Sequence, residues 1–226
     1  MKPCSPSFQE VVRSRHSVRG FLPTPIPRDV LEDILADAQY APSNCNTQPW
    51  QVHIVGGDRL VELRATLVDA LAAEHYSFDF SFDTDDYPGV YRTRAREQGG
   101  RYYRALGVAR SDALTRADVV ERNVRFFGAP HAAFLFLPDV GDNVRVAADV
   151  GMYAQTFLLA LAARGYAGVP QTILGFFADT VRQALGVSGD FKLLFGISFG
   201  MPDSSHPSSG YREGRVRLEE SVVWHE

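Results

Sequence analysis

The sequence contains only two cysteines, Cys4 and Cys45, among its 226 residues. Two cysteines cannot build a disulfide framework, and these two lack the paired spacing of a zinc site. The six histidines are scattered along the chain, with no H-E-x-x-H or similar spacing. The sequence therefore gives no reason to expect a metal centre.

A net positive charge is also lacking. The chain has 23 lysines and arginines against 27 aspartates and glutamates, which gives a formal net charge of -4. Such a chain has no general electrostatic attraction to nucleic acid or to an anionic membrane. The first residues lack the apolar core of a signal peptide. We therefore expect a cytoplasmic protein without a nucleic-acid or membrane partner.

No uninterrupted hydrophobic run is long enough to cross a membrane. The nearest candidate, Val144–Ala163, is interrupted by Arg145, Asp149 and Gln155. Its apolar residues recur at helical spacing, at Val146, Val150, Tyr153, Phe157 and Leu161. This pattern predicts a long, deeply buried helix that is stopped by Gly165.

Two nucleotide-binding motifs are missing from the sequence, and one catalytic motif lacks the secondary structure that it requires. There is no Walker sequence and no G-x-G-x-x-G after a strand, so a phosphorylated cofactor would be bound without the dinucleotide fold. Residues 196–200 match G-x-S-x-G, but Met201-Pro202-Asp203 predicts a turn where a hydrolase elbow needs a helix. A glycine-rich end of a buried strand is the better interpretation of this match.

The remaining pattern predicts one α+β domain over residues 1–226, because long helices enclose a few strands without strict alternation. Pro27 can open a helix, and Asp58 has the character of an N-cap. We expect helices near residues 8–12, 27–40, 58–71, 112–127, 144–163 and 179–185. We expect strands at residues 51–55, 131–137, 167–172 and 191–199, with a possible edge strand at 221–224.

One long segment, residues 76–110, fits no element in this scheme. Its first part is rich in aromatic, acidic and arginine residues, contains Pro88 and Gly99-Gly100, and shows no clear period. Long irregular insertions in compact domains are often functional. We interpret the segment as a mobile, lid-like excursion.

A basic stretch at residues 13–20 carries three arginines, a histidine and two serines without an acid. Arginine forks and hydroxyls at one place suit a phosphate. A solvated basic turn at a helix end explains the same residues, because cations favour the helix C-terminus. A second polar stretch at residues 42–48 has amide and hydroxyl side chains that can satisfy local backbone or a polar ligand ring.

Together with the basic tail at residues 212–217, these stretches resemble the nitroreductase family of FMN-dependent oxidoreductases. The sequence RHSVR at residues 15–19 resembles the N-terminal flavin motif of that family. The sequence APSNCNTQPW at residues 41–50 is similar to its most recognisable segment. Residues 168–171, 194–200 and 211–220 resemble its later strand ends and its phosphate-binding tail.

The resemblance implies an α/β sandwich with a central, mostly antiparallel sheet, in an intertwined homodimer with two FMN sites at the interface. It implies that one chain would supply Arg15, His16, Ser17, Arg19 and Arg215. The partner would supply Pro42, Ser43, Asn44 and Asn46. The helix Val144–Ala163 would lie at the dimer centre.

The chemistry of the flavin then assigns roles to these residues. Arg19 would face the ring edge, while Arg15 and Arg215, with Arg212 as a further candidate, would face the phosphate. The turn formed by Pro170, Gln171, Thr172 and Ile173 would place a backbone N–H near N5 of the flavin, which carries the chemistry.

Arg122 and Arg125 resemble the family's contact to the ribityl or pyrimidine side. A structural ion pair with Glu121 explains them equally well. The sequence departs from the family pattern at Ser208-Ser209, where many members carry an asparagine, and at Thr172, where some carry a carboxylate. Because of the first departure, the sequence does not decide which tail arginine, Arg212 or Arg215, matches the family's phosphate-binding position.

The resemblance implies a ping-pong enzyme that moves electrons from NADH or NADPH through FMN to a nitroaromatic or quinone-like acceptor. Aromatic candidates for the acceptor pocket are Tyr87, Tyr91, Tyr102, Tyr103, Phe126 and Phe127. Other chemistries on the same fold stay open, namely dehalogenation, ring oxidation or flavin cleavage. A non-enzymic flavin-binding protein is a further alternative, since fold does not fix function.

Overall fold

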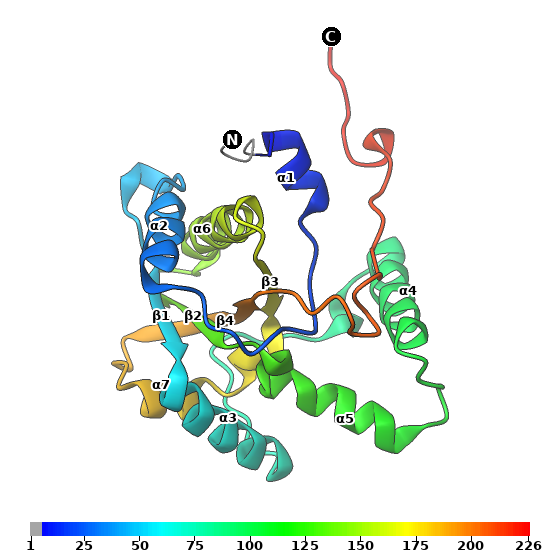
Figure 1. Cartoon of the computed structure of the whole chain (residues 1–226). Helices are drawn as coiled ribbons and strands as arrows, with labels where there is room; N and C mark the ends of the chain where they lie inside the picture. Colours follow the sequence, from blue (N-terminus) through cyan, green and yellow to red (C-terminus); the bar gives the residue numbers. More distant parts are fainter. Residues whose placement is uncertain (1–5) are drawn as a thin grey trace, which may run out of the picture.

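A four-stranded sheet forms the centre of the computed structural model, which describes residues 6–226 (Figure 1). The strands are β1 (Gln51–Gly56), β2 (His131–Pro138), β3 (Ala167–Gln171) and β4 (Phe191–Gly200). Their order across the sheet is β1-β2-β4-β3, and all three neighbouring pairs are antiparallel. The predicted α+β fold with an antiparallel sheet is confirmed.

Both faces of the sheet are buried. Strand β2 is apolar at every position from residue 132 to 137, so its side chains fill the core on both sides. Ala133, Leu135 and Leu137 belong to one core cluster, whereas Phe134 and Phe136 belong to the other. This alternation is what the two-residue period of a strand requires.

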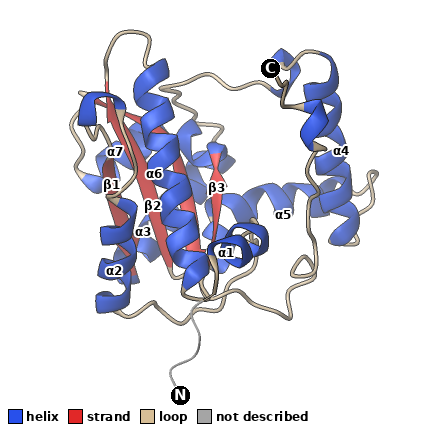
Figure 2. Cartoon of the chain, turned by 90° about the horizontal axis from the view of Figure 1, so that it is seen from above, coloured by secondary structure: helices blue, strands red, loops and turns tan. Residues whose placement is uncertain are grey.

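Helices α2 (Arg28–Ala38) and α6 (Val144–Ala163) cover one face of the sheet and pack against each other (Figures 1 and 2). The bounds of α6 are those that the hydrophobic period predicts. By length and composition, α6 is the one helix in the described residues that could cross a membrane. Its side chains at Val150, Tyr153 and Phe157 are instead buried against the sheet.

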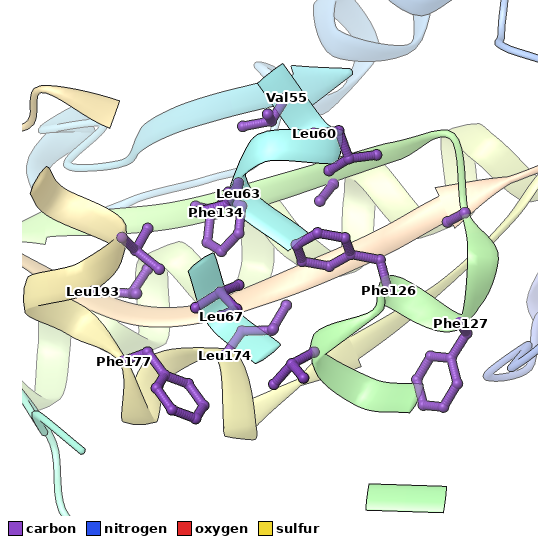
Figure 3. Close-up of a cluster of buried hydrophobic side chains, with 14 of the residues drawn as sticks. Val55, Leu60, Leu63, Leu67, Phe126, Phe127, Phe134, Leu174, Phe177 and Leu193 are labelled. Atoms are coloured by element: carbon purple, nitrogen blue, oxygen red, sulfur yellow. The ribbon is translucent and has the colours of Figure 1, made fainter. Parts of the chain in front are cut away.

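Helices α3 (Gly57–Ala72), α5 (Ala113–Val124) and α7 (Ala178–Leu185) lie on the opposite face. Leu60, Leu63 and Leu67 of α3 point into the cluster around Phe134 (Figure 3). The predicted N-cap at Asp58 is wrong, because Gly56 is the N-cap and Asp58 lies in the first turn. A carboxylate there still favours the positive end of the helix dipole.

The excursion at residues 76–110 contains a regular helix, α4 (Gly89–Ala105), after a short 3-10 helix at Thr84–Asp86. The interpretation of these residues as irregular is therefore wrong for more than half of the segment. Only Tyr102 of α4 is buried, so the helix needs no apolar stripe. A sequence pattern predicts a helix chiefly from such a stripe, and α4 therefore escapes prediction. Both views draw α4 well apart from the sheet (Figures 1 and 2).

The start of the excursion is fixed to the body of the molecule. The Asp79 carboxylate pairs with Arg182 of α7 at 2.5 Å and accepts the Leu193 backbone N–H at 2.6 Å. Ser77 forms a β-bridge with Phe177, and its hydroxyl accepts the Asp179 N–H at 2.9 Å. These bonds join the excursion to α7 and β4.

The two ends of the described chain run outside the layers. Helix α1 (Phe8–Ser14) begins with a capping box between Ser7 and Glu10, and the C-terminal tail follows β4 through residues 201–226. The predicted edge strand at residues 221–224 is wrong, because only a 3-10 turn at Leu218–Glu220 is present. Within the described chain, no strand pairs with residues 221–224.

Candidate functional site

The basic stretch divides into a helical and an extended part. Arg13 and Ser14 end α1, whereas the chain from Arg15 onward runs alongside the sheet. Ser17 forms a parallel β-bridge with Gly168, the second residue of β3. The extended part is thereby placed beside β3.

The extended part and the C-terminal tail meet in one cavity of about 610 Å³, which we call the basic cavity. Its lining comes from the N-terminal stretch, from α4 and from the tail. The lining residues are Val12, Arg13, Arg15, His16, Ser17, Arg19, Gln98, Tyr211, Arg212, Glu213 and Arg215. The structure thus brings together six of the predicted cofactor residues from segments almost 200 positions apart.

The five arginines of the basic cavity form no ion pair within the described residues, and Arg15 and Arg19 are the two that are partly buried. None of the ion pairs among residues 6–226 involves Arg15 or Arg19. Burial and the nearby charge of Arg215 lower the pKa of Arg15, and burial lowers the pKa of Arg19. A cluster of partly desolvated cations favours an anion, because each charge loses hydration without gaining a counter-charge.

The tail arginines are held only by their own backbone. Arg212 donates to the carbonyls of Ser209 and Tyr211 at 2.7 and 3.0 Å. Arg215 donates to the carbonyls of Glu213 and Gly214 at 3.0 and 2.9 Å. Because these contacts are local and exposed, both guanidinium groups can turn toward an anion in the cavity.

His16 lies among these cations. Its Nδ1 is 2.9 Å from the Ser14 carbonyl oxygen. Burial lowers the pKa of His16, and the charges of Arg212, Arg15 and Arg19 lower it further, although the Ser14 contact raises it. The ring is therefore neutral near pH 7, and the Ser14 contact assigns its proton to Nδ1.

The turn after β3 is fixed from inside the protein. The buried Gln171 side chain donates to the Asn123 carbonyl of α5 at 2.9 Å and accepts a hydrogen bond from the Ser198 hydroxyl. Gln171 therefore offers a ligand its backbone rather than its side chain. Ser198 is fully buried within β4, which agrees with a strand end and not with a nucleophile elbow.

Arg122 and Arg125 do not line the basic cavity. With Arg64, Phe127 and Gly128 they border a separate cavity of about 320 Å³. Arg125 pairs with Glu121 at 2.5 Å, as the structural alternative predicts, and Arg122 contacts the ring of His206. The structure does not bring these two arginines together with Arg15 and Arg215.

The amide-rich loop lies elsewhere on the molecule. It forms a 3-10 turn at Asn44–Asn46, in which Cys45 and Asn46 have positive φ angles of 52° and 56°. The Asn44 N–H donates to both carboxylate oxygens of Asp149 in α6, at 3.2 and 3.1 Å. The buried Asp149 thus fixes the turn, and Asn46 stays exposed.

Sequence reasoning missed several residues that build the basic cavity. Gln98 and Glu213 line it, and Tyr102 lies beneath Arg19 with its ring centre 4.7 Å from the guanidinium carbon. Tyr102, a candidate for the acceptor pocket, thus packs against an arginine, and Phe126 is a fully buried core residue. In the sequence, the run of arginines and tyrosines at Arg101-Tyr102-Tyr103-Arg104 is the feature that could have indicated a contact between this segment and a charged site.

The sequence matches the model of the Nitroreductase family over residues 12–201. The chain belongs to the nitroreductase family. It is 41% identical over 214 residues to the nitroreductase NfnB of Mycolicibacterium smegmatis, covering 95% of this chain and 91% of that protein. It is 32% identical to the chloronitrobenzene nitroreductase of Comamonas testosteroni, covering 98% of each chain.

Solved nitroreductase structures share the whole fold. The FMN-dependent nitroreductase NfnB from Mycobacterium smegmatis, crystallised with NADPH, matches with a TM-score of 0.93 and 40% identity, over 96% of this chain and 97% of that one. The FMN- and NADPH-dependent NfnB from sphigopyxis sp. strain HMH matches with a TM-score of 0.94 and 31% identity, over 98% and 100%. The excursion and the tail are included in this overlap.

Proposed function

We propose that the chain is an FMN-dependent oxidoreductase that passes electrons from NADPH or NADH to a nitroaromatic or quinone-like acceptor in a ping-pong cycle. The observation that carries the proposal is the basic cavity, where arginines without carboxylate partners surround a space of about 610 Å³. Relatives of this chain are named as FMN-dependent, NADPH-using nitroreductases, which supports the same assignment.

The donor set of the cavity fits FMN. Arg15, Arg212 and Arg215 present charged forks for a phosphate, and Ser17 adds a hydroxyl. Arg19 lies deeper and is suited to the polar edge of the ring, where its charge favours the reduced form. FMN, when bound, supplies the hydride-accepting and electron-donating chemistry, so no protein nucleophile or base is required.

The residues around the turn after β3 orient this chemistry. The Gln171 side chain is held by Asn123 and Ser198, which fixes the start of the turn that Thr172 and Ile173 continue. A backbone N–H from this turn is the group that we assign to N5 of the flavin. Thr172 in place of a carboxylate does not affect a backbone contact.

We also propose a homodimer, in which the loop Pro42, Ser43, Asn44 and Asn46 completes the partner's site. This loop is not part of the basic cavity of its own chain, although it resembles the family's most recognisable flavin segment. Apolar side chains are exposed on α6, which contacts the loop, and on α1, which packs against α6, at Met152 and Phe8. Covering such side chains favours association.

For Arg122 and Arg125 we keep the ribityl or pyrimidine side of the flavin as a prediction. Arg122 contacts His206, which borders a smaller cavity together with His16 and Arg19. His206 therefore connects Arg122 to the cavity that His16 and Arg19 border. Arg125 must first leave Glu121. A cytoplasmic location fits an enzyme that consumes NADPH or NADH.

The test uses the purified protein incubated with FMN. We expect a yellow protein whose flavin absorbance bleaches under nitrogen on adding NADPH or NADH and returns on adding a nitroarene or a quinone. Light scattering on the same sample should give the mass of two chains. A protein that remains colourless contradicts the flavin site. A yellow protein that neither nucleotide bleaches favours the non-enzymic alternative.

A further inference from the structure

We propose that α4 is a fixed wall of the cofactor site rather than a lid, and that Tyr102 and Arg101 are its two positioning residues. Tyr102 holds Arg19, and Arg101 holds the tail that carries Arg212 and Arg215. The inference rests on the proposed FMN site. It assigns to the excursion a role in cofactor retention that is separate from acceptor binding.

Tyr102 supports Arg19 through its ring face. The ring centre lies 4.7 Å from the guanidinium carbon, within the range of a cation–π contact. Tyr102 is only 8% exposed, and its ring also lies 5.9 Å from that of Tyr211 in the tail. Apart from this contact, the Arg19 side chain has one long hydrogen bond, 3.4 Å to the Ser17 carbonyl. The aromatic face is therefore the main element that fixes the direction of Arg19.

Arg101 holds the tail through a two-point pair with Glu213. Its Nε donates to Glu213 Oε2 at 3.3 Å, and a terminal nitrogen donates to Oε1. The Tyr211 hydroxyl donates to the same carboxylate. Arg101 and Tyr211 hold the pKa of Glu213 below its usual range, in agreement with an ionised, fully bonded carboxylate. A paired fork fixes orientation as well as distance.

The position of Glu213 makes this pair relevant to the cofactor. Glu213 stands between Arg212 and Arg215, and all three line the basic cavity. Fixing the middle residue of a short extended segment limits where its neighbours can point. Arg94 of α4 adds a second tie by pairing with Glu220 at 3.2 Å. The tail is thus attached to α4 on both sides of Arg215.

These contacts argue against an opening lid. Moving α4 away would separate Arg101 from Glu213, uncover Tyr102 and release Arg19 at the same time. Gln98 of α4 also lines the cavity, and its carbonyl oxygen lies 3.4 Å from the Tyr211 hydroxyl. Movement of α4 would consequently break the contacts that close this side of the basic cavity.

The test compares FMN with riboflavin, which has the same ring and ribityl chain but no phosphate. Apoprotein is titrated with each flavin, and quenching of flavin fluorescence gives the dissociation constants. We expect Arg101→Ala to weaken FMN about 10-fold and to leave riboflavin unchanged, because the loss falls on the phosphate contacts. We expect Tyr102→Leu to weaken both flavins alike, by about 5-fold, because Arg19 faces the ring.

Two further variants complete the design. Arg104→Ala removes an exposed charge from the same helix and should change neither constant. The double variant Arg101→Glu with Glu213→Arg restores the pair in reverse and should recover most of the lost FMN affinity. Circular dichroism and the unfolding midpoint of each apoprotein establish that the variants are folded.

The contrary outcomes are distinct. If Arg101→Ala weakens FMN and riboflavin equally, its role is structural and the inference is wrong. Unchanged affinities in both the Arg101 and the Tyr102 variants also overturn it, because α4 would then be independent of the site. If the wild-type apoprotein binds neither flavin, the proposed function itself fails, and this failure is read from the wild type alone.

Discussion

Arginines are concentrated in two regions of this molecule, and the two regions treat them differently. On α4 and its approach, Arg92, Arg96 and Arg101 each face a carboxylate, at distances of 3.9, 2.9 and 3.1 Å from Asp85 or Glu97. In the basic cavity, Arg15 and Arg19 face other cations and an aromatic ring. The three arginines of the first region have counter-charges within the described chain, whereas Arg15 and Arg19 have none.

The comparison separates structural charge from binding charge. Exposed ion pairs contribute little to stability, but they neutralise a region and reduce its attraction for an anion. In the basic cavity five arginines stand against one carboxylate, Glu213, so the cavity keeps an excess of positive charge for an anionic ligand. Composition cannot make this distinction, because both regions appear in the sequence as arginine-rich stretches.

The largest effect that the comparison predicts concerns FMN affinity. Replacing Arg215 by alanine removes an unpaired cation from the basic cavity, and we expect FMN to bind about 30-fold more weakly, since charge-assisted bonds to phosphate are strong. Replacing Arg92 by alanine should change the constant less than about 2-fold, because that charge is paired. Fluorescence titration of both variant apoproteins with FMN measures the two dissociation constants. Equal losses in the two variants would remove the distinction between the regions.

The next effect concerns stability, at a paired arginine that is nearly buried. Asp79 and Arg182 are 13% and 14% exposed at the side chain, and Asp79 also accepts the Leu193 N–H. We expect Asp79→Ala to lower the free energy of unfolding by about 1.5 kcal/mol, since Arg182 then keeps only the exposed Asp179 as a carboxylate partner, beside the Phe191 carbonyl. Urea denaturation of the apoprotein measures the loss.

Glu32→Ala is the matched control for Asp79→Ala. Glu32 pairs with Arg28 at 2.7 Å on the surface, with side chains 59% and 84% exposed. Its removal should change the free energy of unfolding by less than about 0.5 kcal/mol. A loss as large as that of Asp79→Ala would mean that burial does not separate the two pairs.

The smallest effect is a pH dependence at His16. Its folded pKa is lowered, chiefly by burial and then by the surrounding arginines, so the unfolded chain takes up the proton first as the pH falls. The apoprotein should therefore lose stability as the pH drops below about 6.5, and His16→Gln should remove part of this loss. Unfolding midpoints between pH 8 and pH 5 measure the difference. Bound FMN should reduce it, because a phosphate favours the protonated ring, and an unchanged slope would contradict the placement of His16.

The buried part of the fold follows closely from the sequence. The bounds of α6 and the four strands agree with the hydrophobic pattern to within one residue, because burial imposes a strict period on side chains. Helix α4 could not be found in this way, since it buries little and carries Gly99-Gly100 in its interior. The predicted edge strand at the end of the tail is also wrong. Val222 and Val223 have strand character, but they pair with no strand of the described chain.

The site was predictable where charge and motif coincide. The meeting of residues 15–19 with Arg212 and Arg215 was expected from the family resemblance, and the structure places both in one cavity. The direction of Arg125 could not be read in the same way. The Arg125 side chain can pair with Glu121 on its own helix or point toward a ligand, and the sequence allows both. In the structure it pairs with Glu121. Contact of these residues with FMN stays a prediction.

The separation of α4 from the sheet has a consequence for how this family can diversify. Neither core cluster of the described chain contains a residue of α4. Packing around the sheet therefore places no constraint on most of this helix, and substitutions along it leave the free energy of folding nearly unchanged. Apart from Arg94, Gln98, Arg101 and Tyr102, which contact the tail or Arg19, we expect positions on this helix to tolerate substitution. The helix can therefore change its exposed surface without endangering the fold.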